Sequence, residues 1–190
     1  NTVSIRAAVD GLMQSAGSAW SAAMPGIALT WPPLADTAAP AMGVNKLSAS
    51  NLKPTTSATG LFTVLRVLYD WDYSAGRYRR AIQLQAPDAV KDFGVLELEW
   101  PASWLRTPRH AEELGQRMLA WLARPRWRTT WQQSFADVAT GAWVQIDHPL
   151  SPIQGRHRLI SAELDLSAAT LACTVEAPVG AAPAIETMKL

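Results

Sequence analysis

Residues 107–131, TPRHAEELGQRMLAWLARPRWRTTW, change their hydrophobic period once and thereby decide the fold. Thr107 can cap a helix, and Pro108 suits the first helical position because its φ is already fixed near the helical value. An apolar face follows at helical spacing, made of Ala111, Leu114, Met118, Trp121 and Leu122. Pro125 disfavours helical geometry in the residue before it, so we expect a helix over residues 107–124.

Downstream of this helix the hydrophobic period becomes two, which is typical of half-buried strands. Four runs place apolar residues on one side of a strand, with polar residues mainly on the other side. The runs are Trp127, Trp131 and Phe135; Val144 and Ile146; Ile160, Ala162, Leu164 and Leu166; and Leu171, Cys173 and Val175. The pattern predicts a helix packed on antiparallel strands.

The strongest hairpin signal lies upstream, after Gly60. Apolar and aromatic residues alternate from residue 65 to 73 and again from 78 to 84, and the sequence Ser74-Ala75-Gly76 supplies the turn. Gly76 is expected to adopt the positive φ that hairpin turns require and that glycine adopts at little cost. Residues 87–94 are expected to form a loop, and residues 95–100 a further short strand.

The N-terminal part predicts a helix over residues 5–16, with Ile5, Val9, Leu12 and Ala16 on one face, and a short strand around Leu29. From Leu34 to Thr59 no period is visible, and we expect an extended arm lying on a partner or a free linker. The expected divisions are residues 1–34, the connection 35–59, a β domain 60–176 containing the helix, and a tail 177–190.

Length and composition exclude several classes of protein. The chain has 190 residues, 48% of them hydrophobic, which suits one domain with a core of its own. The net charge of +1 argues against nucleic acid as the main ligand, because neutralising phosphates needs a basic surplus. The single cysteine, Cys173, is expected to be a buried small hydrophobe. No apolar run is long enough to span a membrane, and no signal peptide is visible.

Catalytic groups are hard to assemble from this sequence. The histidines His110, His148 and His157 stand in no ligand or catalytic spacing, so we expect solvent-facing or structural roles. Glu97 and Glu99 could form a glycosidase pair, but their alternation with leucine favours an exposed strand edge. The arginines could bind phosphate, but their spread along strands favours salt bridges or a solvated face. We expect no enzyme activity, no cofactor and no metal.

Nine tryptophans are unusual in a chain of this length. Tryptophan is enriched at interfaces, although any single tryptophan can simply belong to the core. The candidates for an interface are Trp20, Trp31, Trp104 and Trp143. Trp143 alternates with Val144 and Ile146 and should face away from the core, and Gly141 is a candidate for a strand entry with positive φ. Burial of the tryptophans against other chains would favour an assembly protein, whereas an exposed concave groove would favour sugar binding.

The order of these elements resembles bacteriophage tail proteins of the baseplate-hub and tail-tip class. Residues 59–72, TGLFTVLRVLYDWD, look like the central strand of that class, which a hairpin follows. Three further segments match in order: the acidic-glycine loop KDFG at 91–94, the helix ending in a proline–arginine junction, LAWLARPR, at 119–126, and the strand GAWVQIDHP at 141–149. Gly155 and RHRLISAELD at 156–165 complete the pattern, which covers roughly residues 1–176. Ala142 departs from it, because the class usually has an acidic residue there.

The resemblance implies an α+β, mainly β fold: an antiparallel tail-tube-like β-barrel or sandwich with a flanking helix and an N-terminal helix. It implies a non-enzymatic part of a virion, made in the host bacterial cytoplasm, that joins tail tube to tail tip as a homotrimer. The expected partners are hub subunits, a distal tail or tube protein and the end of the tape measure. In larger relatives, another half of the hub precedes the region matched here. We therefore expect either that the hub is split between chains or that this chain is a fragment of a larger hub protein.

Two other function classes remain open at this point. The first is a carbohydrate- or receptor-binding β module of a virion, in which surface tryptophans would stack on sugar rings. The second is an enzyme, such as a cell-wall hydrolase associated with a tail tip.

Overall fold

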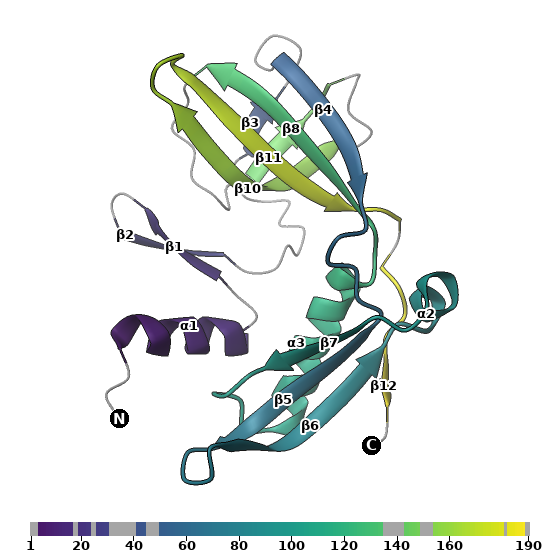
Figure 1. The fold of residues 1–190 in the computed structure, drawn as a ribbon. Coiled ribbons are helices and arrows are strands. Elements are labelled where there is room, and N and C mark those ends of the chain that lie inside the picture. The colour runs from purple at the N-terminus through teal and green to yellow at the C-terminus, as the bar shows by residue number, and fades with distance from the viewer. Residues whose placement is uncertain are drawn as a thin grey trace.

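The computed structural model describes residues 4–16, 19–23, 26–30, 41–44, 50–134, 143–148, 154–180 and 182–188. Within these ranges, three sheets and three helices form two lobes (Figure 1). One lobe contains a four-stranded sheet of order β12-β6-β5-β7, and the other a six-stranded sheet of order β3-β9-β10-β11-β8-β4. The hairpin of β1 (Ala19–Ala23) and β2 (Gly26–Thr30) follows helix α1 (Ile5–Ala16). The fold is mainly β with a flanking helix and an N-terminal helix, as expected.

The four-stranded sheet is built on the predicted hairpin of β5 (Val64–Asp72) and β6 (Arg77–Gln85). Strand β7 (Glu97–Pro101) lies parallel to β5, and β12 (Glu186–Met188) lies antiparallel to β6. The predicted loop over residues 87–94 is instead a short helix, α2 (Pro87–Phe93), with a proline in its first turn and Gly94 after its end. Its seven residues are too few to show a helical period in the sequence.

Helix α3 (Pro108–Leu122) packs against β5 and β6. The Thr107 side chain accepts a hydrogen bond from the His110 amide, so the predicted cap is confirmed. The helix covers the hairpin that precedes it rather than the strands that follow it. Its buried face joins residues of β5 and β6 in one core cluster that includes Ala111, Leu114, Leu119, Leu65, Val67 and Leu84.

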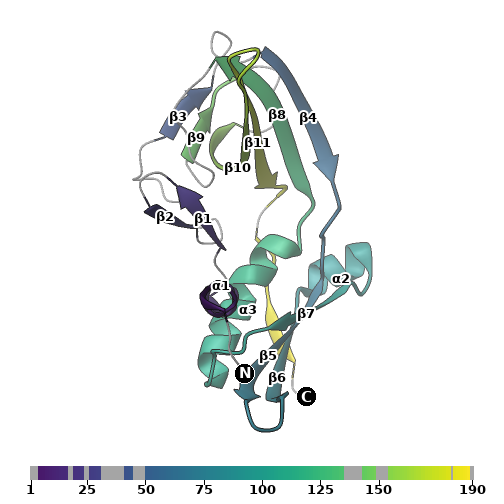
Figure 2. The same cartoon turned by 60° about the vertical axis from the view of Figure 1, so that its left-hand side comes forward.

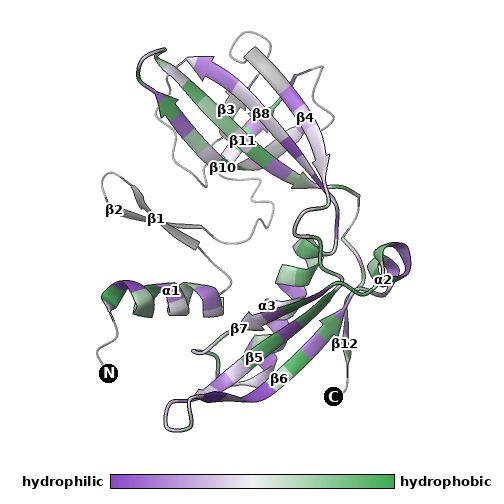
Figure 3. Cartoon of the chain, in the orientation of Figure 1, coloured by the Kyte–Doolittle hydropathy of each residue, from purple (hydrophilic) through white to green (hydrophobic). Residues whose placement is uncertain are grey.

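The six-stranded sheet contains the predicted C-terminal strands, β8 (Arg126–Ser134), β9 (Trp143–Ile146), β10 (Gly155–Asp165) and β11 (Thr170–Pro178). Hydrophobic and hydrophilic residues alternate along β10 and β11 (Figure 3). The buried apolar residues of this sheet form a second core cluster, which includes Trp131, Val144, Ile146, Leu159, Leu171, Cys173 and Val175. The predicted apolar face of Leu171, Cys173 and Val175, on β11, is buried and therefore confirmed.

The predicted apolar face of β10 is partly wrong. Leu159 is buried, whereas Ile160 is 41% exposed, because a register shift against β11 falls between Leu159 and Ser161. A bulge inserts one extra residue and thereby moves a strand's side chains to the opposite face. Ala162 lies opposite Cys173 and packs against the core as the alternation predicts. Leu164, opposite Leu171, is 45% exposed, and Leu166 belongs to the turn after the strand and is 83% exposed.

The extended connection predicted over residues 35–59 contains two strands of the sheet. Strand β4 (Ser50–Ser57) pairs with β8, and β3 (Ala41–Val44) pairs in parallel with β9. Strand β4 lies at an edge of the sheet, where Pro54 is tolerated because one side of the strand needs no donor. Its polar sequence gives no period-two signal, so the pairing could not be predicted locally.

The chain crosses between the lobes before β5, after α3 and after β11 (Figure 2). Two arginines bond these crossing segments to one another. Arg124, after α3, donates to the carbonyl oxygens of Ala120 and Gly180 at 2.8 and 3.0 Å. Arg126 donates to the carbonyl oxygen of Thr59 at 2.6 Å. The three crossing segments, before β5, after α3 and after β11, are thereby held together by guanidinium groups.

Candidate protein-interaction surfaces

Helix α1 packs on the body of the protein through its small residues. A Cβ atom added to Gly11 would lie 3.1 Å from the indole nitrogen of Trp104, a tight contact that would require the indole or the helix to shift. The Ser15 hydroxyl, 3% exposed as a residue, accepts a hydrogen bond from the Trp104 amide at 3.1 Å. The Trp100 indole donates to the carbonyl oxygen of Gln14 at 3.0 Å. These contacts fix the rotation of the helix.

This rotation leaves much of the predicted apolar face of α1 uncovered. Ile5 is 86% exposed and Leu12 is 46% exposed. The helical period predicted this helix correctly, but it could not reveal that Gly11 and Ser15 make the contact with Trp104. Trp104, one of the predicted interface residues, is 48% exposed beside the same helix. We call Ile5, Leu12 and Trp104 the helix patch.

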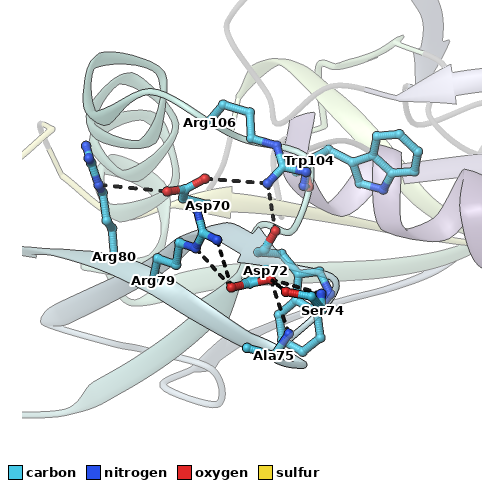
Figure 4. A network of polar contacts seen from close by, with 10 residues as sticks. Asp70, Asp72, Ser74, Ala75, Arg79, Arg80, Trp104 and Arg106 are labelled. Atoms are coloured by element: carbon cyan, nitrogen blue, oxygen red, sulfur yellow. Dashed lines mark hydrogen bonds and ion pairs between the residues drawn. The ribbon is translucent and has the colours of Figure 1, made fainter.

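A polar network fixes the tip of the β5–β6 hairpin (Figure 4). The Asp72 carboxylate accepts hydrogen bonds from the Ser74 hydroxyl at 2.6 Å, the Ser74 amide at 2.9 Å and the Ala75 amide at 3.2 Å. Its second oxygen accepts two bonds from Arg79, at 2.8 and 3.1 Å. The Ser74 hydroxyl and the Arg79 guanidinium hold the pKa of the Asp72 carboxyl well below its usual range.

Asp70 ties the same hairpin to the loop before α3. Its φ of 59° lies in the left-handed region, which is unusual for a residue other than glycine. The Asp70 amide donates to the carbonyl oxygen of Leu105 at 2.8 Å, and its carboxylate lies 3.5 Å from Arg106 and 3.8 Å from Arg80. Arg106 also donates to the carbonyl oxygen of Trp71 at 2.7 Å. These bonds stabilise the strained backbone. The sequence carries no signal for this role.

The structure describes some of the remaining predicted interface tryptophans and turn glycines, and others lie outside the described residues. Trp143 is half-buried on β9, where it lies beside Ala41 of β3 and Arg158 of β10, while Val144 and Ile146 are buried. The backbone of Trp20 lies in β1. Trp31 and Gly141 lie outside the described residues. Gly76 has a φ of 62°, so its positive φ is confirmed.

The titratable residues singled out from the sequence do not come together. His148 is 8% exposed, and His157 contacts the carbonyl oxygen of Gln154 at 3.1 Å. Burial lowers the pKa of His157. Glu97 and Glu99 are exposed on β7, and Glu99 pairs with Arg66 at 3.5 Å. Among the described residues, no three histidine, cysteine or acidic side chains are grouped so that they could hold a metal ion.

A hollow of about 350 Å³ lies against β4, β8, β10 and β11 of the six-stranded sheet. It is lined mainly by polar residues of four strands: Lys53, Thr130, Gln132, Ser161, Glu163 and Thr174. Trp131 also borders it, but the residue is 1% exposed and its indole donates to the Gln133 side chain. Stacking on a sugar needs an accessible aromatic face, and Trp131 offers none.

None of the helices in the described part of the chain combines the length and apolar character that crossing a membrane requires. No protein-family model matches the sequence, and no curated protein matches it either. Solved structures, however, share its fold. A chain of the virion of a native gene transfer agent particle is 14% identical and has a TM-score of 0.61, with 92% of this chain and 40% of that chain covered.

Two tail proteins give similar results. The 43 kDa tail protein of prophage MuSo2 from Shewanella oneidensis is 10% identical, with a TM-score of 0.54 and coverage of 90% of this chain and 53% of that one. The tail protein from Neisseria meningitidis MC58 is 10% identical, with a TM-score of 0.52 and coverage of 87% and 52%. This chain therefore spans about half of those chains or less. Identities this low show the fold alone, and by that measure the chain has the fold of phage tail proteins.

Proposed function

We propose that the protein is a structural component of a phage-type tail, located in the virion at the tail tip or baseplate hub. Its work is to join the tail tube to the tip through protein–protein contacts. The observation that carries this proposal is the fold likeness, which runs along 92% of the chain and therefore includes both lobes rather than one common sheet. Fold alone does not define function, so the surfaces of the chain supply the second argument.

The helix patch is the contact that we assign to a neighbouring tail protein. Ile5 and Leu12 are exposed on a helix whose other side is held by hydrogen bonds, and apolar residues grouped on an exposed face mark protein-interaction sites. The partners we propose are other hub subunits, a distal tail or tube protein and the end of the tape measure, with copies of this chain arranged as a homotrimer.

We propose a non-enzymatic role for the polar clusters as well. Asp70 and Asp72 are engaged in fixing a hairpin, and Arg124 and Arg126 in joining the lobes. Rigid joints of this kind suit a part that transmits geometry between neighbours. Glu97 and Glu99, the pair considered for glycoside hydrolysis, lie on an exposed strand face, where Glu99 already pairs with Arg66.

The test is incorporation into particles. In a phage or tail-like system lacking this gene, the parent chain should restore complete tails, and Ile5→Asp should not. Ile5 is 86% exposed, so the substitution should leave the melting temperature unchanged. Loss of a central apolar anchor commonly costs about 2 kcal/mol of binding, roughly a thirtyfold loss of affinity.

The matched control is Arg109→Asp, which alters a side chain that is 85% exposed on α3. It should be incorporated like the parent. Tails that assemble without this chain would overturn the proposal, and normal incorporation of Ile5→Asp would remove α1 from it.

A further inference from the structure

The two ends of the four-stranded sheet carry opposite charge. Strand β5 has nine residues, so its two ends lie roughly 26 Å apart at about 3.3 Å per residue. One end is the hairpin tip, where Tyr73, Arg77, Arg79, Arg80 and Arg106 form what we call the basic tip. The other end is formed by α2 and the start of β7, where Asp88, Asp92, Phe93, Val95, Leu96 and Glu97 form what we call the acidic shelf.

At the basic tip the carboxylates are more covered than the guanidinium groups. The side chains of Asp70 and Asp72 are 22% and 14% exposed, whereas those of Arg79 and Arg80 are 59% exposed or more. The surface offered to a partner is therefore cationic and held in place by the network of Figure 4. Arg77 is exposed and makes no ion pair with any described residue.

The basic tip also carries an aromatic ring. Tyr73 is 66% exposed, and the guanidinium carbon of Arg106 lies 5.5 Å from the centre of its ring. Tyrosine and arginine are enriched among the residues that contribute most to binding at protein interfaces.

The acidic shelf combines negative charge with apolar surface. Asp88, Asp92 and Glu97 are exposed, and Lys91 is the single cation between residues 87 and 97. Beside them three apolar side chains are unusually open: Phe93 at 44%, Val95 at 68% and Leu96 at 40%.

Thr63 holds this segment in a fixed position. Its buried hydroxyl donates to the carbonyl oxygen of Gly94 at 2.7 Å and accepts from the Leu96 amide at 2.9 Å. The apolar surface is thus displayed on a fixed backbone and is not a product of a loose loop.

We propose that copies of this chain bind one another head to tail, with the basic tip of one copy against the acidic shelf of the next. The two surfaces are complementary in charge, and each adds exposed aromatic or apolar area, so that Tyr73 would meet Phe93 and Val95. A net charge of +1 leaves little overall repulsion between copies. Because the surfaces lie at opposite ends of one sheet, the contact is heterologous and closes into a ring where the rotation permits. The closure of the ring rests on the proposed homotrimer. The contact between two copies of this chain does not depend on that proposal.

Sedimentation velocity of the purified full chain tests the contact. The parent should self-associate at low ionic strength and dissociate as salt rises, because exposed charges are screened beyond about 10 Å at 0.1 M salt. Arg77→Glu breaks no ion pair and should weaken association about tenfold or more by opposing like charges. Lys91→Glu is the matched control with the same change of charge, and it should strengthen association because it adds to the acidic shelf.

A mixing experiment identifies the occupant. Arg77→Glu and the double variant Asp88→Lys/Asp92→Lys should each associate poorly alone, whereas an equimolar mixture should associate, since the basic tip of one meets the acidic shelf of the other. A parent that stays monomeric at low salt, equal effects of Arg77→Glu and Lys91→Glu, or a mixture that stays dissociated would each overturn the proposal. Failure here leaves the Ile5→Asp incorporation result intact, so the two proposals fail separately.

Discussion

Gly76 and Ala169 occupy the same position in two equivalent hairpin turns. The sequences DYSAG (72–76) and DLSAA (165–169) each use the aspartate to accept bonds from the following serine and alanine, at 2.6, 2.9 and 3.2 Å in both turns. The last residue of each adopts positive φ, 62° in Gly76 and 49° in Ala169. Only the second turn places a side chain in the left-handed region.

Ala169→Gly should therefore stabilise the protein. The left-handed conformation costs an L-residue roughly 1–2 kcal/mol, and glycine's greater freedom in the unfolded chain returns about 0.5–1 kcal/mol of that. The expected net gain is about 0.5–1 kcal/mol, measured as the free energy of unfolding in urea.

Gly76→Ala is the reciprocal change and should destabilise the protein by a similar amount. Open space surrounds the position of its added Cβ, so the effect is one of backbone conformation alone. A gain in stability from Gly76→Ala, or a loss from Ala169→Gly, would contradict the equivalence of the two turns.

A local sequence pattern predicts the second turn, although the alternation of apolar residues does not. The DxSA pattern occurs after both β5 and β10, and its first occurrence is the predicted hairpin. Comparing the two would have placed Leu166 in the turn instead of on the apolar face of β10. The bulge after Leu159 has no such signature, because it depends on how β10 meets β11 rather than on local residues.

The two turn aspartates should make the protein sensitive to acid. Hydrogen bonds from the Ser74 hydroxyl and Arg79 lower the pKa of Asp72, and the Ser167 hydroxyl and the Ala168 amide lower that of Asp165. A lowered pKa contributes stability above the unfolded value of about 3.9, and this is lost as pH falls below it.

Melting temperatures between pH 7 and pH 2 provide the measurement. Asp72→Asn keeps an oxygen for the turn but cannot titrate, so its melting temperature should fall less steeply below pH 4 than that of the parent. Asp88→Asn, on the exposed side of α2, should follow the parent. Identical slopes for Asp72→Asn and the parent would contradict the assignment.

Gly115 sets the distance between α3 and the four-stranded sheet. A Cβ atom at this position would lie 2.4 Å from Leu84 Cδ1 and 3.3 Å from Val67 Cγ2, and both side chains are fully buried. Gly115→Ala gains about 1 kcal/mol of helix propensity, but overpacking typically costs 1–3 kcal/mol. Net destabilisation is expected in urea unfolding, whereas Gln116→Ala, on the exposed side of the helix, should be neutral or slightly stabilising.

Helix α3 also shows what a sequence pattern can and cannot predict. Its period, its Thr107 cap and its end before Pro125 follow from local rules, and the structure agrees with them. The burial of Gly115 and the fully covered Leu119 could not be derived from them, because both depend on which sheet the helix meets. Asp70 is a similar case, since its left-handed backbone is held by residues 35 positions away.

Cys173 should be chemically inert until the protein unfolds. It is 1% exposed, and burial raises the pKa of its thiol to about 11. Because the raised pKa favours the protonated thiol, its contribution to stability is complete below the unfolded value of about 8.5 and is lost as pH rises toward 11. A thiol reagent at pH 8 should label the native chain only at the rate of unfolding. Rapid stoichiometric labelling would contradict the burial.

The seating of α1 should depend on Gly11. A side chain there would meet the Trp104 indole at 3.1 Å, and hydrogen bonds of Ser15 and Gln14 also hold the helix on the body. Gly11→Val should displace the helix without unfolding the core clusters, which contain no residue of α1. Trp104 would become more exposed, so the fluorescence emission should shift to longer wavelength, and protease should cleave before β1 at rates at least tenfold above the parent's. Leu12→Val is the control, because it places the same side chain on the exposed side of the helix.

If the helix patch joins this protein to its neighbour, Gly11→Val should also be excluded from particles, since Ile5 and Leu12 would no longer be held beside Trp104. Normal incorporation with a displaced helix would mean that the neighbour binds elsewhere.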